Sequence, residues 1–300
     1  MRPPVDVVIV SYNSRRTLRA CIEPLLGLAG VSVTVVDNCS TDGSLSVLAE
    51  LPVRRIRAER NGGFGSGCNL GAAAGCAPLL LFVNPDAQIE PAALARLVDA
   101  LEAEPRLGLV GPRIVGWGGA LLPSMRRYQR VGSVWASALF LHRVFPRAAW
   151  ANEVIRDPEA YEMPAEPEWV SGACMLVRRR VFEALGGFDE RFFLYAEDMD
   201  LCVRVREAGY RVGYEPAAVV RHQGGASAPR PSLYGTLARS RIQFARKHAS
   251  WAGATLQQLG LAVGALAHLL ATAGFASRRR GHAAALRAIV AEARLGTGGA

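Results

Sequence analysis

The stretch Val5-Asp-Val-Val-Ile-Val-Ser-Tyr-Asn13 decides the fold, because an apolar run of strand length ends there in polar residues. The same layout recurs at Val31–Val36, which is followed by Asp37, and at Leu79–Val83, which is followed by Asn84-Pro-Asp86. Helix patterns separate these strands. Strands that alternate with helices over roughly a hundred residues predict βαβ units. We therefore expect an α/β fold, with a mostly parallel central sheet and helices on both faces.

The pattern changes further along the chain. A strand is predicted at 107–110, an irregular stretch at 116–167, a strand at 169–177, a helix ending near Ala208, and short strands at 210–214 and 217–220. From Pro231 onward the sequence favours helix. These patterns predict a domain at 1–230 and a helical C-terminal appendage at 231–300.

Composition narrows the function classes. Half of the 300 residues are hydrophobic and 20% are charged, which excludes a disordered chain. The net charge of +9 is uneven: residues 1–230 hold 26 basic and 25 acidic groups, and residues 231–300 hold nine basic groups and Glu292. A nucleic-acid binder would carry its basic groups across the fold. The distribution instead indicates a near-neutral domain with a basic appendage, and no nucleic acid as partner.

The cysteines and the N-terminus bear on the compartment. None of the six cysteines forms a C-x-x-C pair or a zinc-like spacing with histidine. Most of them lie in apolar runs, which is typical of reduced, buried cysteine. The first residues lack the layout of a signal peptide, because Asp6 interrupts the apolar run. We expect an intracellular, reduced chain.

Polar residues at predicted strand ends are the first candidates for a site, since ligands of α/β sheets collect at the carboxyl ends of strands. Asp86 follows an apolar strand and a proline, and a carboxylate there suits a hard divalent cation that also binds phosphate oxygens. His222, which ends a later strand, is a candidate second ligand. The alternative for Asn84-Pro-Asp86 is an ordinary turn. The glycine-rich loop 61–67 fits neither G-x-G-x-x-G nor a P-loop, which disfavours dinucleotide redox and P-loop chemistry.

A second candidate lies at the start of a predicted helix. Asp198 shares a helix face with Leu201, Cys202 and Val205, so it points toward the apolar side at the helix N-terminus. A carboxylate held there is a candidate general base. The alternative is a helix-capping acid that the helix dipole favours.

Nine motifs in this order resemble family 2 of the inverting glycosyltransferases, which have the Rossmann-like GT-A fold. They are Val8-Ile-Val-Ser-Tyr-Asn13, Val35-Val-Asp-Asn-Cys-Ser-Thr-Asp-Gly-Ser44, Asn61-Gly-Gly-Phe-Gly65, Asn69, Phe82-Val-Asn-Pro-Asp86, Trp169-Val-Ser-Gly-Ala173, Gly186-Gly-Phe-Asp-Glu-Arg-Phe-Phe193, Glu197-Asp-Met-Asp-Leu-Cys-Val-Arg204 and Val220-Arg-His222. The resemblance covers about residues 5–225, and the Asn-Pro-Asp form is most similar to bacterial rhamnosyltransferases.

The resemblance implies a role for each matching residue. Tyr12 and Asp37 would contact the nucleotide base and ribose, and Asn61 and Asn69 would line the donor pocket. Asp86 would bind Mg²⁺ or Mn²⁺ on the donor diphosphate. The remaining implied site residues are Asn84, which replaces the first Asp of the family's D-x-D, His222 as second metal ligand, Trp169, Gly172 and Glu197 lining the site, and Asp198 as catalytic base.

The function that follows is inverting transfer of a sugar from a nucleoside-diphosphate donor to a hydroxyl of a lipid-linked or polysaccharide acceptor in cell-surface glycan synthesis. The resemblance favours L-rhamnose from dTDP-rhamnose. Alternatives are another UDP-, dTDP- or GDP-sugar, a sugar-phosphate nucleotidyltransferase, and a non-enzymatic nucleotide-sugar-binding protein at a membrane surface.

The C-terminal appendage contains an apolar stretch, Leu259–Ala276, with basic residues on both sides. Flanks of similar charge suit a helix that lies on an anionic cytoplasmic membrane surface better than a spanning helix. We expect peripheral attachment to the cytoplasmic face. The alternatives are a helical hairpin packed on the catalytic domain, a homodimer in which Gly260 and Gly264 let two helices approach, and a true span.

Overall fold

The computed structural model describes residues 2–223, 231–272 and 274–296. The chain forms two compact units. The first comprises Met1–Arg126, Asp157–Glu190 and Glu197–Gly224, and the second comprises Arg127–Arg156, Arg191–Ala196 and Gly225–Ala300. The second unit thus contains two segments besides the C-terminal residues 231–300 that the sequence pattern set apart.

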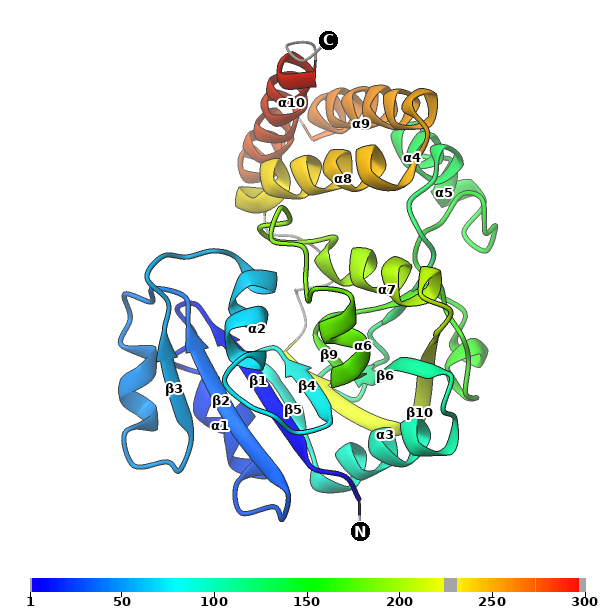
Figure 1. Ribbon diagram of the computed structural model, residues 1–300. Helices are drawn as coiled ribbons and strands as arrows, with labels where there is room; N and C mark the ends of the chain where they lie inside the picture. The colour runs from blue at the N-terminus through cyan, green and yellow to red at the C-terminus, as the bar shows by residue number, and fades with distance from the viewer. Residues whose placement is uncertain (1, 224–230, 273, 297–300) are drawn as a thin grey trace. The chain divides into compact units, whose positions relative to one another are not determined.

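The first unit is built on an eight-stranded sheet with the order β3-β2-β1-β4-β9-β6-β10-β5 (Figure 1). Its strands are β1 Val5–Ser11, β2 Val31–Asp37, β3 Arg54–Arg57, β4 Leu79–Val83, β5 Ala87–Ile89, β6 Leu107–Val115, β9 Cys174–Arg178 and β10 Arg211–His222. Strands β3, β2, β1 and β4 run parallel, as do β6 and β10, whereas β9 and β5 are antiparallel to their neighbours. The predicted mostly parallel sheet is confirmed.

Helices cover both faces of this sheet, because the apolar strands present alternate side chains to two cores. Val5, Val7 and Ile9 of β1 pack into one core, and Val8 and Val10 into the other. The helices of the first core are α1 Leu18–Ile22 and α3 Pro91–Ala103, and those of the second are α2 Phe64–Ala72, α6 Arg179–Ala184 and α7 Glu197–Glu207. Figure 1 shows α2 and α6 on the opposite side of the sheet from α3.

Two strand predictions differ from the structure. The predicted strand 169–177 is interrupted at Ser171-Gly172, which leaves β8 Trp169–Val170 paired with β7 Met125–Arg126 in a second small sheet. The two short strands predicted near the end of the domain form one strand, β10, with an irregularity between Glu215 and Val219. The break at Gly172 brings the backbone N–H of this residue to the side chain of Asp198.

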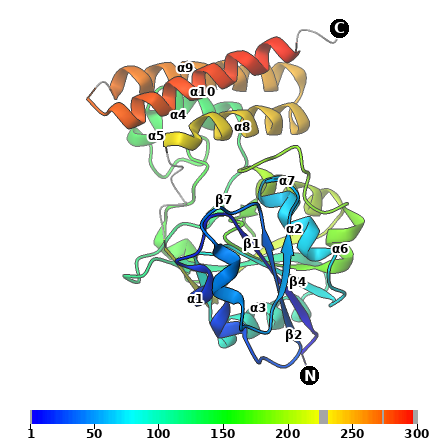
Figure 2. The same cartoon turned by 90° about the vertical axis from the view of Figure 1, so that its left-hand side faces the viewer.

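The second unit is helical (Figure 2). Its helices are α4 Val131–Ala138, α5 Leu141–Val144, α8 Tyr234–His248, α9 Trp251–Ala271 and α10 Ala276–Gly296. A small core of alanines and isoleucines joins α8, α9 and α10. The stretch 116–167, predicted to be irregular, contributes α4, which packs on α9: a side chain at Gly260 would collide with Val134, and Ala138 lies against Gly264. The close helix approach expected at this glycine pair therefore occurs within the chain.

Candidate active site

The carboxyl ends of β1 and β2 each carry a buried polar atom that no other described residue hydrogen-bonds. Ser11 and Asp37 are neighbours in the parallel register of these strands. Their side chains are almost fully buried, and within the part of the chain that the structure describes Ser11 Oγ and Asp37 Oδ1 have no hydrogen-bond partner. Buried polar atoms are normally satisfied, so two adjacent exceptions at a strand end indicate a position for a polar ligand.

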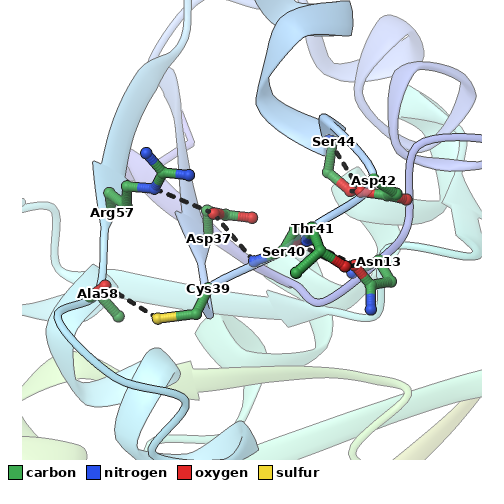
Figure 3. Close-up of polar contacts among 9 residues, drawn as sticks. All are labelled: Asn13, Asp37, Cys39, Ser40, Thr41, Asp42, Ser44, Arg57 and Ala58. Carbon is green, nitrogen blue, oxygen red and sulfur yellow. Dashed lines mark hydrogen bonds and ion pairs between the residues drawn. The ribbon is translucent and has the colours of Figure 1, made fainter.

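The other oxygen of Asp37 is engaged (Figure 3). Asp37 Oδ2 accepts a hydrogen bond from the Ser40 backbone N–H at 3.3 Å, and the exposed Arg57 guanidinium lies 3.8 Å from the same atom. One oxygen is therefore held by the protein and one is available. This arrangement suits a carboxylate that accepts hydrogen bonds from a nucleoside.

Side-chain bonds between the loops after β1 and β2 fix the rim of this position (Figure 3). Asn13 Oδ1 in the first loop accepts a hydrogen bond from Thr41 N in the second at 2.8 Å, and within the second loop Asp42 Oδ1 accepts one from Ser44 N at 2.9 Å. Tyr12 follows β1 in the sequence and precedes Asn13 of this network, and it is 54% exposed. An exposed aromatic ring beside a rigid polar loop is available to stack on a ligand base.

Asp86 and His222 lie together, as the sequence predicted. His222 Nε2 is 3.0 Å from Asp86 Oδ1, and the histidine is 2% exposed while the Asp86 side chain is 33% exposed. The pairing of β5 with β10 at the end of the sheet produces this contact, because His222 is opposite Ala87. A buried imidazole nitrogen beside a half-open carboxylate fits a divalent cation that takes its other oxygens from a diphosphate. Over the described ranges no cluster of three or more His, Cys, Asp or Glu is arranged to hold a metal by itself.

Asp198 is held by backbone donors at the start of α7. Its Oδ2 accepts a hydrogen bond from Gly172 N at 2.8 Å, and its Oδ1 accepts one from Met199 N at 2.8 Å. A Cβ at position 172 would lie 3.2 Å from the Asp198 Cβ, so glycine permits this approach. The neighbouring Ala173 accepts a hydrogen bond from Asn84 N at 2.9 Å, which ties the Asn84-Pro-Asp86 turn to the same strand break.

Burial is the main influence on the charge of Asp198. It raises the pKa of this carboxyl, while the N–H donors of Gly172 and Met199 and the charge of Arg126 lower it. Arg126 is held over the Trp169 ring, with its guanidinium carbon 5.3 Å from the ring centroid. Trp169, predicted to line the site, therefore positions a cation that favours the ionised form of Asp198.

Glu197 precedes Asp198 and is 5% exposed. Burial, and then the charge of Asp198, hold the pKa of Glu197 well above its ordinary value. Its Oε2 has no hydrogen-bond partner among the residues 2–223, 231–272 and 274–296. Burial and the neighbouring charge thus favour the protonated form of Glu197, whereas at Asp198 the backbone N–H donors and Arg126 counteract the effect of burial.

The glycine-rich segment leads into α2 and differs from expectation in one residue. Asn61 Oδ1 accepts a hydrogen bond from Gly63 N at 3.1 Å, just before α2 begins at Phe64. Asn69, expected to line the donor pocket, instead bonds to both backbone groups of Phe188: Oδ1 accepts from Phe188 N at 2.8 Å and Nδ2 donates to Phe188 O at 2.9 Å. Its amide is thus used to brace the loop before α7.

The sequence pattern alone does not indicate roles for Ser11, Arg57 or Arg126. An orphaned hydroxyl and a cation stacked on tryptophan depend on tertiary contacts. The only local signal was the position of Ser11 at a strand end.

The geometry agrees with the comparison to protein families. Residues 6–186 match the model of "Glycosyl transferase family 2". The chain belongs to this family. Its motifs, its sheet and the pairing of Asp86 with His222 are thereby parts of a glycosyl-transferring enzyme.

A relative with assigned activity is N-acetylglucosaminyl-diphospho-decaprenol L-rhamnosyltransferase of Mycobacterium tuberculosis. It is 34% identical over 277 residues, which cover 86% of this chain and 89% of the relative. The hexosyltransferase Agl10 of Haloferax volcanii is 23% identical over 71% of this chain and 65% of its own.

Solved structures share the fold. Mannosyltransferase PcManGT from Pyrobaculum calidifontis, in complex with GDP-Man and Mn²⁺, has a TM-score of 0.55 at 20% identity, covering 99% of this chain and 80% of its own. Glucosyl-3-phosphoglycerate synthase from Mycobacterium tuberculosis, with Mn²⁺ and UDP, has a TM-score of 0.56 at 17% identity, covering 82% and 80%. Both are glycosyltransferases of the predicted GT-A fold.

Proposed function

We propose that this enzyme transfers an L-rhamnosyl group from dTDP-rhamnose to a hydroxyl of a polyprenyl-diphosphate-linked sugar, with inversion at the anomeric carbon. The identity to the mycobacterial rhamnosyltransferase over most of both chains is the observation that carries the choice of donor and acceptor. The proposed mechanism rests on the arrangement of the site residues.

Asp198 acts as the general base. Its carboxylate takes the proton of the acceptor hydroxyl, the resulting oxygen attacks the anomeric carbon, and the bond from that carbon to the diphosphate oxygen breaks. The two backbone N–H groups that bind Asp198 fix its orientation, and Arg126 favours its ionised form. A single base on the acceptor side suits one displacement, hence inversion.

Ser11, Asp37 and Tyr12 would bind the nucleoside, because they combine unpartnered buried polar atoms with an exposed ring. Asp86 and His222 would hold a divalent cation on the donor diphosphate, with Asn84 beside them at the turn. The cation, Mg²⁺ or Mn²⁺, would neutralise charge on the leaving diphosphate.

The acceptor class places the reaction at a membrane. We propose that the enzyme is peripheral on the cytoplasmic face of the cell membrane, where a polyprenyl-linked acceptor and a soluble nucleotide sugar meet. The helix Trp251–Ala271 is long and apolar enough to span a membrane, but length and composition alone support such a span only weakly.

A donor screen tests the proposal. Full-length protein is incubated with Mg²⁺ or Mn²⁺, a short-chain polyprenyl-diphospho-N-acetylglucosamine, and in turn dTDP-rhamnose, UDP-glucose, UDP-galactose and GDP-mannose. We expect a rhamnosylated product from dTDP-rhamnose alone, inverted configuration by NMR, and loss of turnover with EDTA. Efficient transfer from another donor would contradict the rhamnose assignment, and retention of configuration would contradict the single-displacement mechanism.

A further inference from the structure

The exposed face of helix α9 is apolar, which is unusual for a helix of a water-soluble protein. Its exposed face carries large apolar side chains that repeat every three or four residues: Leu256, Leu259, Val263, Leu266 and Leu270. At 100° per residue these five lie within an arc of about 80°. We call this set the apolar stripe. Their exposed fractions range from 39% to 70%.

The buried face of α9 holds small and polar residues instead. Gly260 and Gly264 lie against α4, and Gln257, 3% exposed, accepts a hydrogen bond from Gln129 Nε2 at 2.7 Å. Trp135 Nε1 donates to the Leu256 carbonyl at 3.0 Å. A soluble helix buries its leucines and exposes its polar residues. The reversed order in α9 indicates that its outer face meets an apolar medium.

Charge distinguishes the candidates for that medium. The residues of the second unit include sixteen Lys and Arg and only two Glu, and both glutamates pair with arginines: Glu153 with Arg241, and Glu292 with Arg246. A second copy of the chain would bring the same positive charge to the stripe and repel it. An anionic lipid surface would attract it.

The ends of the stripe have residues suited to a membrane interface. Trp251, 84% exposed, begins α9, and Phe275, 61% exposed, follows it. Arg278 lies over the Phe275 ring at 5.5 Å, and Arg278, Arg279 and Arg280 are exposed. Aromatic rings flanking an apolar face, with arginines next to them, are typical of helices that lie in the headgroup region.

A transmembrane orientation of α9 would require it to leave α4, with the loss of the Gln129–Gln257 and Trp135–Leu256 hydrogen bonds. We propose that α9 lies in the plane of an anionic phospholipid bilayer, with the apolar stripe inserted at the acyl boundary and Arg278–Arg280 against the lipid phosphates. This inference deepens the proposed membrane location and rests on it.

Vesicle flotation tests the surface with full-length protein. We expect binding to vesicles of phosphatidylglycerol and phosphatidylcholine, weaker binding to pure phosphatidylcholine, and release by high salt. The double variant Leu259→Gln/Leu266→Gln should lower the vesicle partition coefficient about tenfold or more, because two leucine side chains lose their apolar contact. Arg279→Gln/Arg280→Gln should lower it roughly fivefold per arginine. The matched control is Trp117→Gln/Met163→Gln, which changes two exposed apolar residues of the first unit and should bind like the wild type.

The outcomes distinguish membrane binding through the apolar stripe from dimerisation and from a membrane span, and they test it independently of the proposed reaction. Flotation of the stripe variant equal to wild type, or no wild-type flotation, overturns the inference. If the wild type sediments as a dimer and the stripe variant as a monomer, a second copy of the chain covers the apolar stripe instead of lipid. Protein released only by detergent identifies a span. Transfer to a water-soluble acceptor, measured on the same samples without vesicles, reports separately on the glycosyltransferase function.

Discussion

At the residue scale, Gly172 determines how the carboxylate of Asp198, the proposed base, is positioned. The break between β8 and β9 turns its N–H toward Asp198, and the lack of a side chain leaves room for the carboxylate. Local sequence made this position look like part of a continuous strand. Only the contact with α7 explains why a glycine is needed there.

The Gly172→Ala variant tests this role. The added Cβ would lie 3.2 Å from Asp198 Cβ and 3.3 Å from Oδ2, so the carboxylate must move. We expect kcat to fall about tenfold to a hundredfold, because small misplacements of a reacting group are costly, while the Kd for dTDP stays unchanged. Gly118→Ala, where the new atom meets open space, is the control. An unaltered kcat for Gly172→Ala would remove the positioning role.

The pH dependence of kcat tests the surroundings of Asp198. Burial raises its pKa above the ordinary value of about 3.9, and the base must be ionised to act, so activity should fall on the acid side at a higher pH than for a free aspartate. Arg126 lowers this pKa, so Arg126→Gln should move the acid limb to still higher pH. The exposed Arg60 offers a charge-matched control, Arg60→Gln. A shift toward lower pH in Arg126→Gln would contradict the electrostatic account.

The order of the motifs predicted contacts between site residues only where the topology of the strands brings those residues together. Asp86 and His222 are 136 positions apart and still lie together, because Asp86 directly precedes the edge strand β5, which pairs with the end of β10 that carries His222. Asn69 lies in an equally recognisable motif, yet its amide is used by Phe188. A motif gives the residue type, but the partner of an amide depends on the packed loop.

At the scale of elements, α7 is anchored by a buried ion pair. Asp200, fully buried, accepts a hydrogen bond from Arg204 Nε at 2.8 Å, and Arg204 also donates to the carbonyls of Leu185 and Gly187. These bonds join the helix that begins with Glu197 and Asp198 to the loop after α6. Helix α7 is thereby held by this loop as well as by the Gly172 N–H that binds Asp198.

Arg204→Met should therefore destabilise the protein. The substitution removes the cation beside buried Asp200 and three hydrogen bonds, so we expect a loss of about 3–5 kcal/mol in the free energy of unfolding. Urea denaturation of Arg204→Met and of Arg180→Met, an exposed arginine on α6, measures the difference. Equal midpoints and slopes would show that the buried pair contributes nothing.

Packing of α9 against α10 contains a stacked histidine pair. The rings of His268 and His282 are 5.2 Å apart at 15°, and Phe140 contacts His268. Burial is the first cause that lowers the pKa of each; Arg143 and His142 add to it for His268, and His268 and Arg278 for His282. Both rings therefore favour the neutral form in the folded chain.

The sign of the pH effect follows from these lowered values. The unfolded histidines protonate near pH 6.5 and the folded ones at lower pH, so packing is most stable above about pH 6.5 and weakens as pH falls toward the folded pKa. Hydrogen exchange of α9 and α10, corrected for intrinsic rates, should show less protection at pH 5.5 than at pH 7.5. His268→Leu should reduce this difference. Greater protection at pH 5.5 in the wild type would contradict the assignment.

Period and length predicted the buried strands and the helical character of residues 231–300, but they did not predict the helix α4 within 116–167. Strands such as β4, Leu79–Val83, are apolar throughout and have no other plausible structure. The segment 116–167 lacks a clear period, because α4 is only eight residues long and packs Val134 and Ala138, rather than a stripe of leucines, against Gly260 and Gly264. A helix recognised by small-residue contact has almost no local signal.

At the scale of the whole molecule, the two compact units divide the charge more unevenly than the two sequence segments do. The first unit contains nineteen basic and 24 acidic residues, and the second contains sixteen basic and two acidic. The positive charge thus belongs to a folded helical unit that includes Arg127–Arg156, rather than to a C-terminal tail. That unit also carries the apolar stripe, while the carboxylates of the proposed site belong to the other.

The central claim is that this family 2 enzyme transfers rhamnose with Asp198 as its base. The direct test is the single-turnover rate of dTDP-rhamnose consumption by wild type, Asp198→Asn and the surface control Asp99→Asn, together with the Kd for dTDP. We predict that Asp198→Asn lowers the rate by about 10²–10⁴ with unchanged dTDP affinity, and that Asp99→Asn matches the wild type. A wild-type rate in Asp198→Asn would contradict the account.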